Sequence, residues 1–306
     1  MTDTLFAQYP APGKLVGVNG QRLHLYALGD RSGPTVLFES GQLGFSLDWM
    51  RVQPEVARFT RAVTYDRAGL GWSDAGPHPR TAQRIVAELH TVLAHAGVPL
   101  PLVLVAHSLG WRYALRYARQ YPEEVAGLVA VDGYDAAFDR ALGPHKLASF
   151  MRGRARQYHG LDLLARLGVV RLFGPQLLGL LGPEFRTIPA REQRRYLALV
   201  TRPQAVDTTI EEYEQAVASD AAEAEQPPPE RLPATVPLQV LSHGIPWRYP
   251  EYERAWQQAQ AAITELSANG EQRKAERSGH PIMLGQPELA VAAIEQVVGV
   301  VRAAAP

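Results

Sequence analysis

In the first half of the chain, short apolar runs alternate with segments whose apolar residues recur at helical spacing. The clearest apolar runs span residues 35–38, 62–65, 102–106 and 127–131. Each run has the length of a strand and is apolar almost throughout, which is typical of a strand buried on both faces. Because such strands alternate with helical segments, the pattern predicts an α/β fold with a mostly parallel sheet and helices on both faces.

Local signals mark the ends of several other elements. Asn19-Gly20 separates two strand-like runs and predicts a two-residue hairpin turn. Thr81 is a suitable N-cap for a helix with one apolar face, and Gly97 is a suitable end for it. Further helices are expected over residues 47–59 and 109–121.

The pattern changes between residues 140 and 230, where the segments are helix-like and none has the pattern of a strand. The proline-rich stretch 226–233 is the expected return to the core. The elements expected after it are a strand at 238–241, a helix over 251–267, a strand near 273–275 and a helix that begins at Pro287. We therefore predict a core of residues 1–139 and 231–306 and a helical cap of residues 140–230.

The predicted cap has an uneven charge distribution. Residues 140–202 hold 12 Lys and Arg against 3 Asp and Glu, whereas residues 203–230 hold 8 acidic residues and no basic one. Two interpretations fit this pattern. The helical faces complement each other or face solvent, or a basic pocket mouth attracts an acidic substrate.

Composition places the chain among ordinary globular proteins. Of 306 residues, 46% are hydrophobic and 20% charged, and 31 basic residues balance 31 acidic ones. This balance argues against nucleic acid or an anionic membrane as a partner. The absence of cysteine excludes disulfides, a thiolate nucleophile and cysteine metal sites. With no signal peptide visible and charges in every long apolar stretch, we expect no membrane span and a cytoplasmic location.

The most informative segment is Leu-Val-Ala-His-Ser-Leu-Gly-Trp, residues 104–111. It joins a buried strand to a helix, with Ser108 at the turn and the small residues Ala106 and Gly110 on either side. This is the pattern of a nucleophile elbow, in which a tight turn exposes the serine hydroxyl. The helix N-terminus also offers N–H donors to a developing oxyanion. Ser108 is therefore the candidate nucleophile.

A serine nucleophile needs a general base, which can come from a distant loop. Of nine histidines, the candidate is His280, in a glycine-flanked loop between the last short strand and the last helix. His243, just after the strand at 238–241, is its competitor. His107 belongs to the turn itself, so we expect its side chain to point away from the Ser108 hydroxyl.

The candidate acid is Asp132, directly after the strand that follows the nucleophile strand. A carboxylate there can accept the imidazole Nδ1–H and fix the tautomer that faces the serine. The loop after 238–241 contains no aspartate, and its nearby carboxylates, Glu251 and Glu253, resemble first-turn helix residues. Asp135 is a second, reserve candidate.

Two backbone N–H groups are expected to hold the oxyanion. One belongs to Leu109, and the other to Gln42, because Gly41 lets an early loop approach closely. The glycine-rich loop 65–73 lacks the spacing and the lysine of a phosphate-binding loop. We expect that loop to brace the floor of the active site.

Together these segments resemble the α/β-hydrolase superfamily, and within it a capped, esterase-like branch with a Ser-His-Asp triad. The matching segments, in chain order, are 39–41, 65–73, 106–110, 131–132 and 278–280. The resemblance covers nearly the whole chain outside the helical insertion. Ala106 departs from it, since glycine is usual there, and so does Trp111, where a second glycine is usual.

The resemblance implies an eight-stranded sheet and a serine hydrolase that cleaves carboxylic esters, possible lactones and aryl esters included, through an acyl-enzyme. Ser108 would attack the carbonyl, His280 would carry the proton and Asp132 would orient His280. Many members carry the acid after the insertion, and the absence of aspartate there favours the variant with the acid before it. Epoxide hydrolase and dehalogenase relatives have aspartate in place of Ser108, which disfavours their chemistry. No cofactor and no metal are expected.

The substrate pocket is expected to draw on the cap and on the elbow. The apolar cap residues are Leu161, Leu163, Leu164, Leu167, Val169, Val170, Leu172 and Phe173. Gly41, His107 and Trp111 are the other expected substrate contacts. Two alternatives remain open. One is a peptidase, amidase or lyase with the same triad, and the other is a non-catalytic small-molecule-binding protein of this fold.

Overall fold

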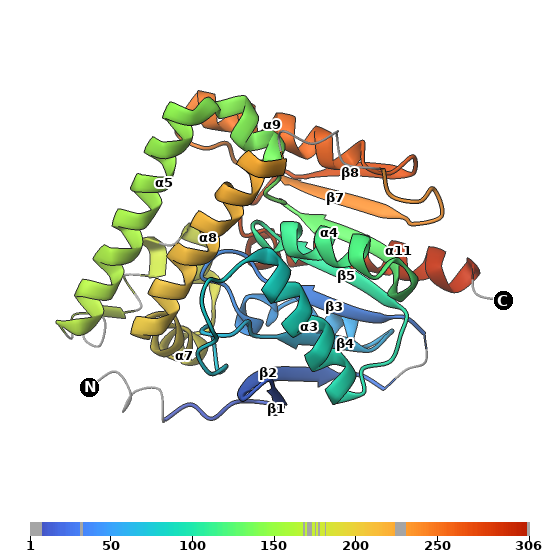
Figure 1. Ribbon diagram of the computed structural model, residues 1–306, viewed down its shortest axis with the longest axis horizontal. Coiled ribbons are helices and arrows are strands. Elements are labelled where there is room, and N and C mark those ends of the chain that lie inside the picture. Colours follow the sequence, from blue (N-terminus) through green and yellow to red (C-terminus); the bar gives the residue numbers. More distant parts are fainter. Residues whose placement is uncertain are drawn as a thin grey trace.

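An eight-stranded sheet in the order β1-β2-β4-β3-β5-β6-β7-β8 forms the centre of the computed structural model (Figure 1). The structure describes residues 8–30, 33–167, 169, 173–174, 176, 178–180, 182–223 and 231–304. The strands are β1 Lys14–Val18, β2 Gln21–Leu28, β3 Thr35–Glu39, β4 Ala62–Tyr65, β5 Leu102–His107, β6 Val125–Val131, β7 Leu238–His243 and β8 Gly270–Ala275. Only the pairs β1–β2 and β2–β4 are antiparallel. The predicted mostly parallel, eight-stranded sheet is confirmed.

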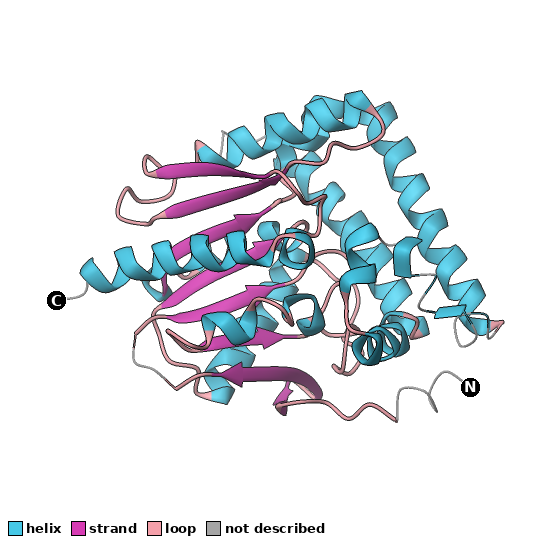
Figure 2. Cartoon of the chain, turned by 180° about the vertical axis from the view of Figure 1, so that it is seen from behind, coloured by secondary structure: helices cyan, strands magenta, loops and turns pink. Residues whose placement is uncertain are grey.

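The apolar strands are buried on both sides because successive side chains face opposite helical layers. In β5, Leu104 and Ala106 belong to one core cluster, while Val103 and Val105 belong to the other. The first cluster includes residues of α3 Ala82–Ala96, α4 Gly110–Gln120 and α9 Pro250–Thr264. The second includes residues of α2 Gln53–Val56, α10 Ile282–Gly285 and α11 Pro287–Ala304. Figures 1 and 2 show α3 and α11 on opposite faces of the sheet.

The predicted turn and cap signals are found where the sequence placed them. Asn19 and Gly20 both have positive φ, 49° and 87°, as a type I′ hairpin turn between β1 and β2 requires. The Thr81 hydroxyl accepts a hydrogen bond from the N–H of Arg84, and α3 ends at Gly97 in the left-handed conformation. These ends follow from local backbone chemistry, which a sequence displays directly.

The single helix expected over residues 47–59 is wrong. The segment contains a short 3-10 helix, Ser46–Trp49, and then α2, with Pro54 in its first turn. Proline has no N–H to donate, and its ring collides with the carbonyl four residues earlier in a continuous helix. A new helical turn therefore begins at the proline.

A helical insertion connects β6 to β7. Its elements are α5 Ala136–Arg166, which is kinked at Gly143, two 3-10 helices at Leu178–Leu180 and Pro183–Thr187, α7 Ala190–Val200 and α8 Pro203–Glu223. The described part of this insertion contains no strand, as predicted, and it begins a few residues before 140. Residues 226–230 of the expected return linker lie outside the described residues.

The insertion lies beyond the carboxyl ends of the parallel strands. In Figure 2 the arrows of the parallel strands point toward the helices that Figure 1 labels α5, α7 and α8. A further 3-10 helix, Pro122–Glu124, precedes β6 on the other side. Loops at the carboxyl edge of a parallel sheet are the usual place for a ligand. Within the described ranges, no helix combines the length and apolar content that a bilayer crossing requires.

Candidate active site

The turn between β5 and α4 exposes Ser108. The φ of Ser108 is 48°, in the left-handed region that few residues with a side chain adopt, and such strain is common at functional turns. Gly110 is required here, because a Cβ at this position would lie 2.5 Å from the Ser40 carbonyl oxygen. The small residue two positions after the serine thus lets α4 approach the loop after β3.

The three predicted triad residues meet at the carboxyl edge of the sheet. Ser108 follows β5, Asp132 follows β6, and His280 lies in the loop after β8. His280 Nε2 is 2.9 Å from Ser108 Oγ, and His280 Nδ1 is 2.6 Å from Asp132 Oδ2. An imidazole in this position can accept the hydroxyl proton while the carboxylate holds its tautomer.

Asp132 is fully buried and accepts four hydrogen bonds. Oδ2 accepts from the Nδ1 atoms of His280 and His243, and Oδ1 accepts from the backbone N–H of His243 and from Trp256 Nε1. Burial alone would raise the pKa of this carboxyl. The hydrogen bonds and charges of the two histidines outweigh burial and hold the pKa of Asp132 below its ordinary value. Asp132 is therefore ionised at neutral pH.

His243, the competitor for the base, contacts Asp132 and Glu253. Its Nδ1 is 2.7 Å from Asp132 Oδ2, and its Nε2 is 2.9 Å from Glu253 Oε2. Burial opposes its protonation, but the two carboxylates raise the pKa of His243 to about 9. Both ring nitrogens thus donate to carboxylates, and the structure brings His280, not His243, to the serine.

Replacing His243 with glutamine should destabilise the protein most at low pH. A folded-state pKa of about 9, against about 6.5 unfolded, gives stabilisation that is complete below pH 6.5 and is lost as pH rises toward 9. The difference corresponds to at most about 3 kcal/mol. Urea unfolding at pH 6 and pH 9.5 measures it, with His145→Gln, at an exposed histidine, as the control. An equal loss at both pH values would contradict the expectation.

The loop after β3 approaches the elbow closely. A Cβ on Gly41 would lie 2.7 Å from His107 Nδ1 and 3.0 Å from Ser108 Cβ, so only glycine fits. In the described part of the chain, the backbone N–H groups of Gln42 and Leu109 donate to no protein acceptor. Two free donors beside the serine hydroxyl are what an oxyanion needs.

Arg67 braces this loop from the glycine-rich segment 65–73. It donates to the carbonyl oxygens of Ser40 and Gly41 and forms ion pairs with Glu39 and Glu212, all of them buried. Burial raises the pKa of Glu39 to about 7, although Arg67 and Tyr65 lower it. Glu212 lies in α8, so Arg67 also connects the insertion to the loop. The bracing was expected, whereas no local signal identified Glu212.

Comparison with known proteins agrees with this architecture. Residues 34–167 match the family model described as the alpha/beta hydrolase fold. A laboratory-evolved variant of potato epoxide hydrolase has a TM-score of 0.74 at 17% identity, covering 94% of this chain and 98% of that one. An esterase from Thermogutta terrifontis has a TM-score of 0.66 at 22% identity, covering 94% and 97%. The chain thus has the α/β-hydrolase fold, and residues 34–167 match the sequence model of that fold.

Curated relatives match shorter stretches. An uncharacterized protein of Schizosaccharomyces pombe is 30% identical over 200 residues, which are 55% of this chain and 36% of that protein. An uncharacterized protein of Bacillus subtilis is 31% identical over 119 residues, 39% of this chain and 47% of its own. The matches thus span less than half the length of either relative.

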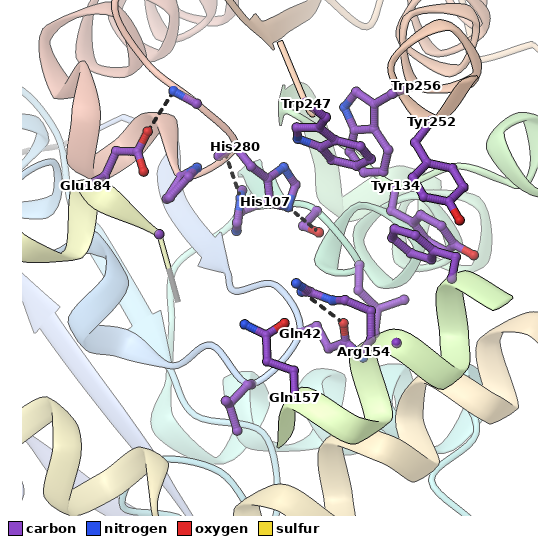
Figure 3. Close-up of a pocket in the computed structure, with 18 of the residues that line it drawn as sticks. Gln42, His107, Tyr134, Arg154, Gln157, Glu184, Trp247, Tyr252, Trp256 and His280 are labelled. Atoms are coloured by element: carbon purple, nitrogen blue, oxygen red, sulfur yellow. Dashed lines mark hydrogen bonds between the residues drawn. The ribbon is translucent and has the colours of Figure 1, made fainter. Parts of the chain in front are cut away.

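A cavity of about 640 Å³ opens over Ser108 and His280 (Figure 3). Aromatic side chains predominate in its lining, from the insertion, from the loop after β7 and from α9. They are Tyr134, Phe150, Tyr158, Phe185, Tyr196, Tyr213, Trp247, Tyr249, Tyr252 and Trp256. Gln42, His107 and Leu109 complete the floor. Such a cavity suits a small molecule with apolar parts.

The apolar residues expected to form the pocket do not line it. Leu164 is half-buried against the core, and Phe173 is 56% exposed. Leu163, Leu167 and Val169 are also absent from the lining. Val170 and Leu172 lie outside the described residues, and so does the side chain of Leu161. The expectation is wrong because helical spacing shows an apolar stripe but not which neighbour that stripe faces.

Trp111, a further expected substrate contact, lies away from the cavity. Its indole is fully buried in the core on α4, and a Cβ on Gly133 would lie 3.0 Å from its Cγ. It is absent from the cavity lining. The departure from glycine at this position therefore affects helix packing, and the cavity floor is not crowded by it.

His107 lines the cavity, as expected, and does not bond to Ser108. Its Nε2 is 3.1 Å from the carbonyl oxygen of His280, and the two rings are 4.6 Å apart. Burial, reinforced by His280, lowers the pKa of His107 to about 3. The neutral ring therefore donates its Nε2–H to the loop that carries His280 and helps to position that loop.

Asp132, His243 and His280 are also residue types that bind metals, and their donor atoms lie within 4.8 Å of one another. Each of these atoms already takes part in a short hydrogen bond. The carboxylate lies between the two Nδ1 atoms, while the Nε2 atoms face Glu253 and Ser108. The hydrogen-bond network by itself accounts for this cluster.

Proposed function

We propose that this chain is a serine hydrolase that cleaves carboxylic esters through an acyl-enzyme, with lactones and activated aryl esters in range. The observation that carries the proposal is the continuous hydrogen-bonded series from Ser108 through His280 to a buried, ionised Asp132 at the floor of the cavity. A buried carboxylate with this geometry is the orienting group that a serine nucleophile needs.

In the proposed reaction, Ser108 Oγ attacks the ester carbonyl while His280 Nε2 takes the hydroxyl proton. The N–H groups of Leu109 and Gln42 stabilise the negative oxygen of the tetrahedral intermediate. His280 then gives its proton to the leaving alcohol, and the acyl group stays on Ser108. Water, deprotonated by His280, releases the acid and restores the hydroxyl.

Two features support ester chemistry within this superfamily. Position 108 is a serine, whereas the epoxide hydrolases that this chain resembles are expected to use aspartate there. One structural neighbour is named an esterase. The helical insertion supplies much of the cavity wall, so we propose that residues 140–230, together with the start of α5, act as its cap.

A fluorophosphonate probe and a panel of 4-nitrophenyl esters test the proposal. We expect covalent labelling of one serine, identified as Ser108 by peptide mass spectrometry, and turnover with an initial burst of nitrophenol. A protein that binds small molecules without chemistry would show neither. An amidase would cleave matched anilides at rates comparable to the esters, which we do not expect.

Replacing Trp111 with alanine should cost stability and leave ester-size preference unchanged. Removing a fully buried indole lowers the free energy of unfolding by about 3–5 kcal/mol. The ratio of kcat/KM for butyrate and octanoate esters should stay within about twofold, a difference of about 0.4 kcal/mol. Phe150→Ala, at a residue that lines the cavity, should change that ratio. If the Trp111 variant changed the ratio of kcat/KM for the two esters, the indole would be a substrate contact after all.

A further inference from the structure

One positively charged side chain, that of Arg154, lines the aromatic cavity. Of the described residues that line it, Arg154 is the only lysine or arginine, and Glu184 is the only aspartate or glutamate. Arg154 comes from α5 and points toward Gln42 in the loop after β3, while Glu184 lies on the other side of His280 (Figure 3). The two charges therefore occupy different parts of the cavity.

Arg154 is held by neutral partners. Its Nη2 donates to Tyr158 Oη at 2.9 Å and reaches Gln42 Oε1 at 3.4 Å, and the guanidinium lies over the Tyr158 ring, 5.3 Å from its centre. Within the described ranges, no carboxylate lies within ion-pair distance of it. Glu184 instead accepts the backbone N–H of Gly279 at 2.7 Å. Several guanidinium donors thus remain available to a ligand.

A guanidinium against aromatic walls attracts an anion more strongly than an exposed one does, because the surroundings screen the charge less. A carboxylate matches the fork of its N–H donors and forms two parallel charge-assisted hydrogen bonds. From these contacts we propose that Arg154 binds a carboxylate of the substrate, so that the preferred ester carries a negative charge. This inference rests on the proposed ester hydrolysis.

The position of Arg154 relates that carboxylate to the scissile bond. Gln42 follows Gly41, which lies so close to Ser108 that a Cβ on it would be 3.0 Å from Ser108 Cβ. A carboxylate bound beside Gln42 is therefore a short chain away from the carbonyl under attack. The half-ester of a short dicarboxylic acid has this form, and so does an ester whose alcohol part carries the carboxylate.

Charges of both signs lie near the cavity. The protonated His243 lies between the carboxylates of Asp132 and Glu253 and offsets one of these two negative charges. Residues 140–202, which include Arg154, hold 12 basic against 3 acidic residues. Among the described residues of this range, Arg154 is the only lysine or arginine that lines the cavity, so the inference rests on Arg154 and not on the excess.

Matched esters test the inference. In the first pair, the acyl chain of a 4-nitrophenyl ester ends in a carboxylate in one compound and in a carboxamide in the other. In the second pair, the carboxylate or the carboxamide is on the alcohol part of the ester. We expect Arg154→Gln to lower the ratio of kcat/KM for charged over neutral ester about 10- to 100-fold in one pair. Arg154→Lys, which keeps the positive charge, should lower this ratio less. Arg156→Gln removes the same charge from an exposed position of α5 and should leave the ratio within about twofold.

Ligand binding separates this inference from the proposed function. Glutarate binding is measured by calorimetry in Ser108→Ala with and without Arg154→Gln, which needs no turnover. We expect the second change to weaken binding at least tenfold. The inference would be overturned if the parent and Arg154→Gln hydrolysed esters with the same ratio of kcat/KM for charged over neutral ester and if glutarate bound equally well with and without Arg154→Gln. The proposed ester hydrolysis would still stand in that case. Glutarate binding that depends on Arg154 in a protein without hydrolysis would support the anion site and overturn the proposed function.

Discussion

Ser108→Ala is expected to abolish ester turnover and probe labelling while the protein stays folded. The change removes the only oxygen within hydrogen-bond distance of His280 Nε2 in the described structure. Loss of a serine nucleophile lowers kcat by about 10⁴-fold or more, because binding and oxyanion contacts alone give little rate. The elbow itself should persist, since the N–H of residue 108 still donates to the Val131 carbonyl.

Three measurements check this expectation: kcat/KM for a short 4-nitrophenyl ester, labelling by the fluorophosphonate, and the urea midpoint of unfolding. Ser149→Ala is the matched control, because Ser149 is the other serine that lines the cavity in the described part of the chain. Labelling should continue in the Ser149 variant. If the Ser108 variant were labelled at Ser149, the nucleophile would be misassigned.

Asp132→Asn is expected to lower kcat by about 10⁴-fold, or roughly 5.5 kcal/mol of barrier, with KM little changed. An amide at this position can donate to His280 Nδ1, which stabilises the tautomer whose Nε2 carries a proton and cannot act as a base. The same change leaves the imidazolium of His243 with only Glu253 as a charged partner. We therefore also expect some loss of stability, measurable by urea unfolding.

Glu253→Gln is the control that distinguishes the two possible acids. Its carboxylate contacts His243 and the N–H of Trp247, not His280, so kcat should stay within about tenfold, or 1.4 kcal/mol. Glu251→Gln and Asp135→Asn should stay within the same limit. If the Asp132 variant stayed active and the Glu253 variant lost its kcat, Glu253 and not Asp132 would be the acid of the triad.

The sequence by itself determined the sheet and the turn that carries Ser108, the candidate nucleophile. Strands apolar at every position had to be buried on two faces, and Asn19-Gly20 favours one turn type, so these features required no knowledge of distant contacts. The meeting of Ser108 with Asp132 followed from topology. Residues directly after neighbouring parallel strands lie at the same edge of a sheet.

The competition between His280 and His243 was decided only in three dimensions. His243 ends β7 and His280 follows β8, and both contact Asp132 through Nδ1. The loop after β8 turns back so that His280 reaches Ser108, and the start of α9 brings Glu253 to His243. The spacing of residues along the chain does not show in which direction the loops after β7 and β8 run, because the path of a loop depends on what it packs against.

The cavity wall, too, was decided only by the tertiary structure. On α5, Leu164 faces the core, whereas Arg154 and Tyr158 face the cavity, and Trp111 on α4 is covered by core residues. Helical periodicity gives the angle between side chains on one helix, but the docking of that helix decides which angle points at Ser108. Docking is fixed by side chains far apart in the chain, as when Arg67 binds Glu212, and a single sequence shows no such pairs.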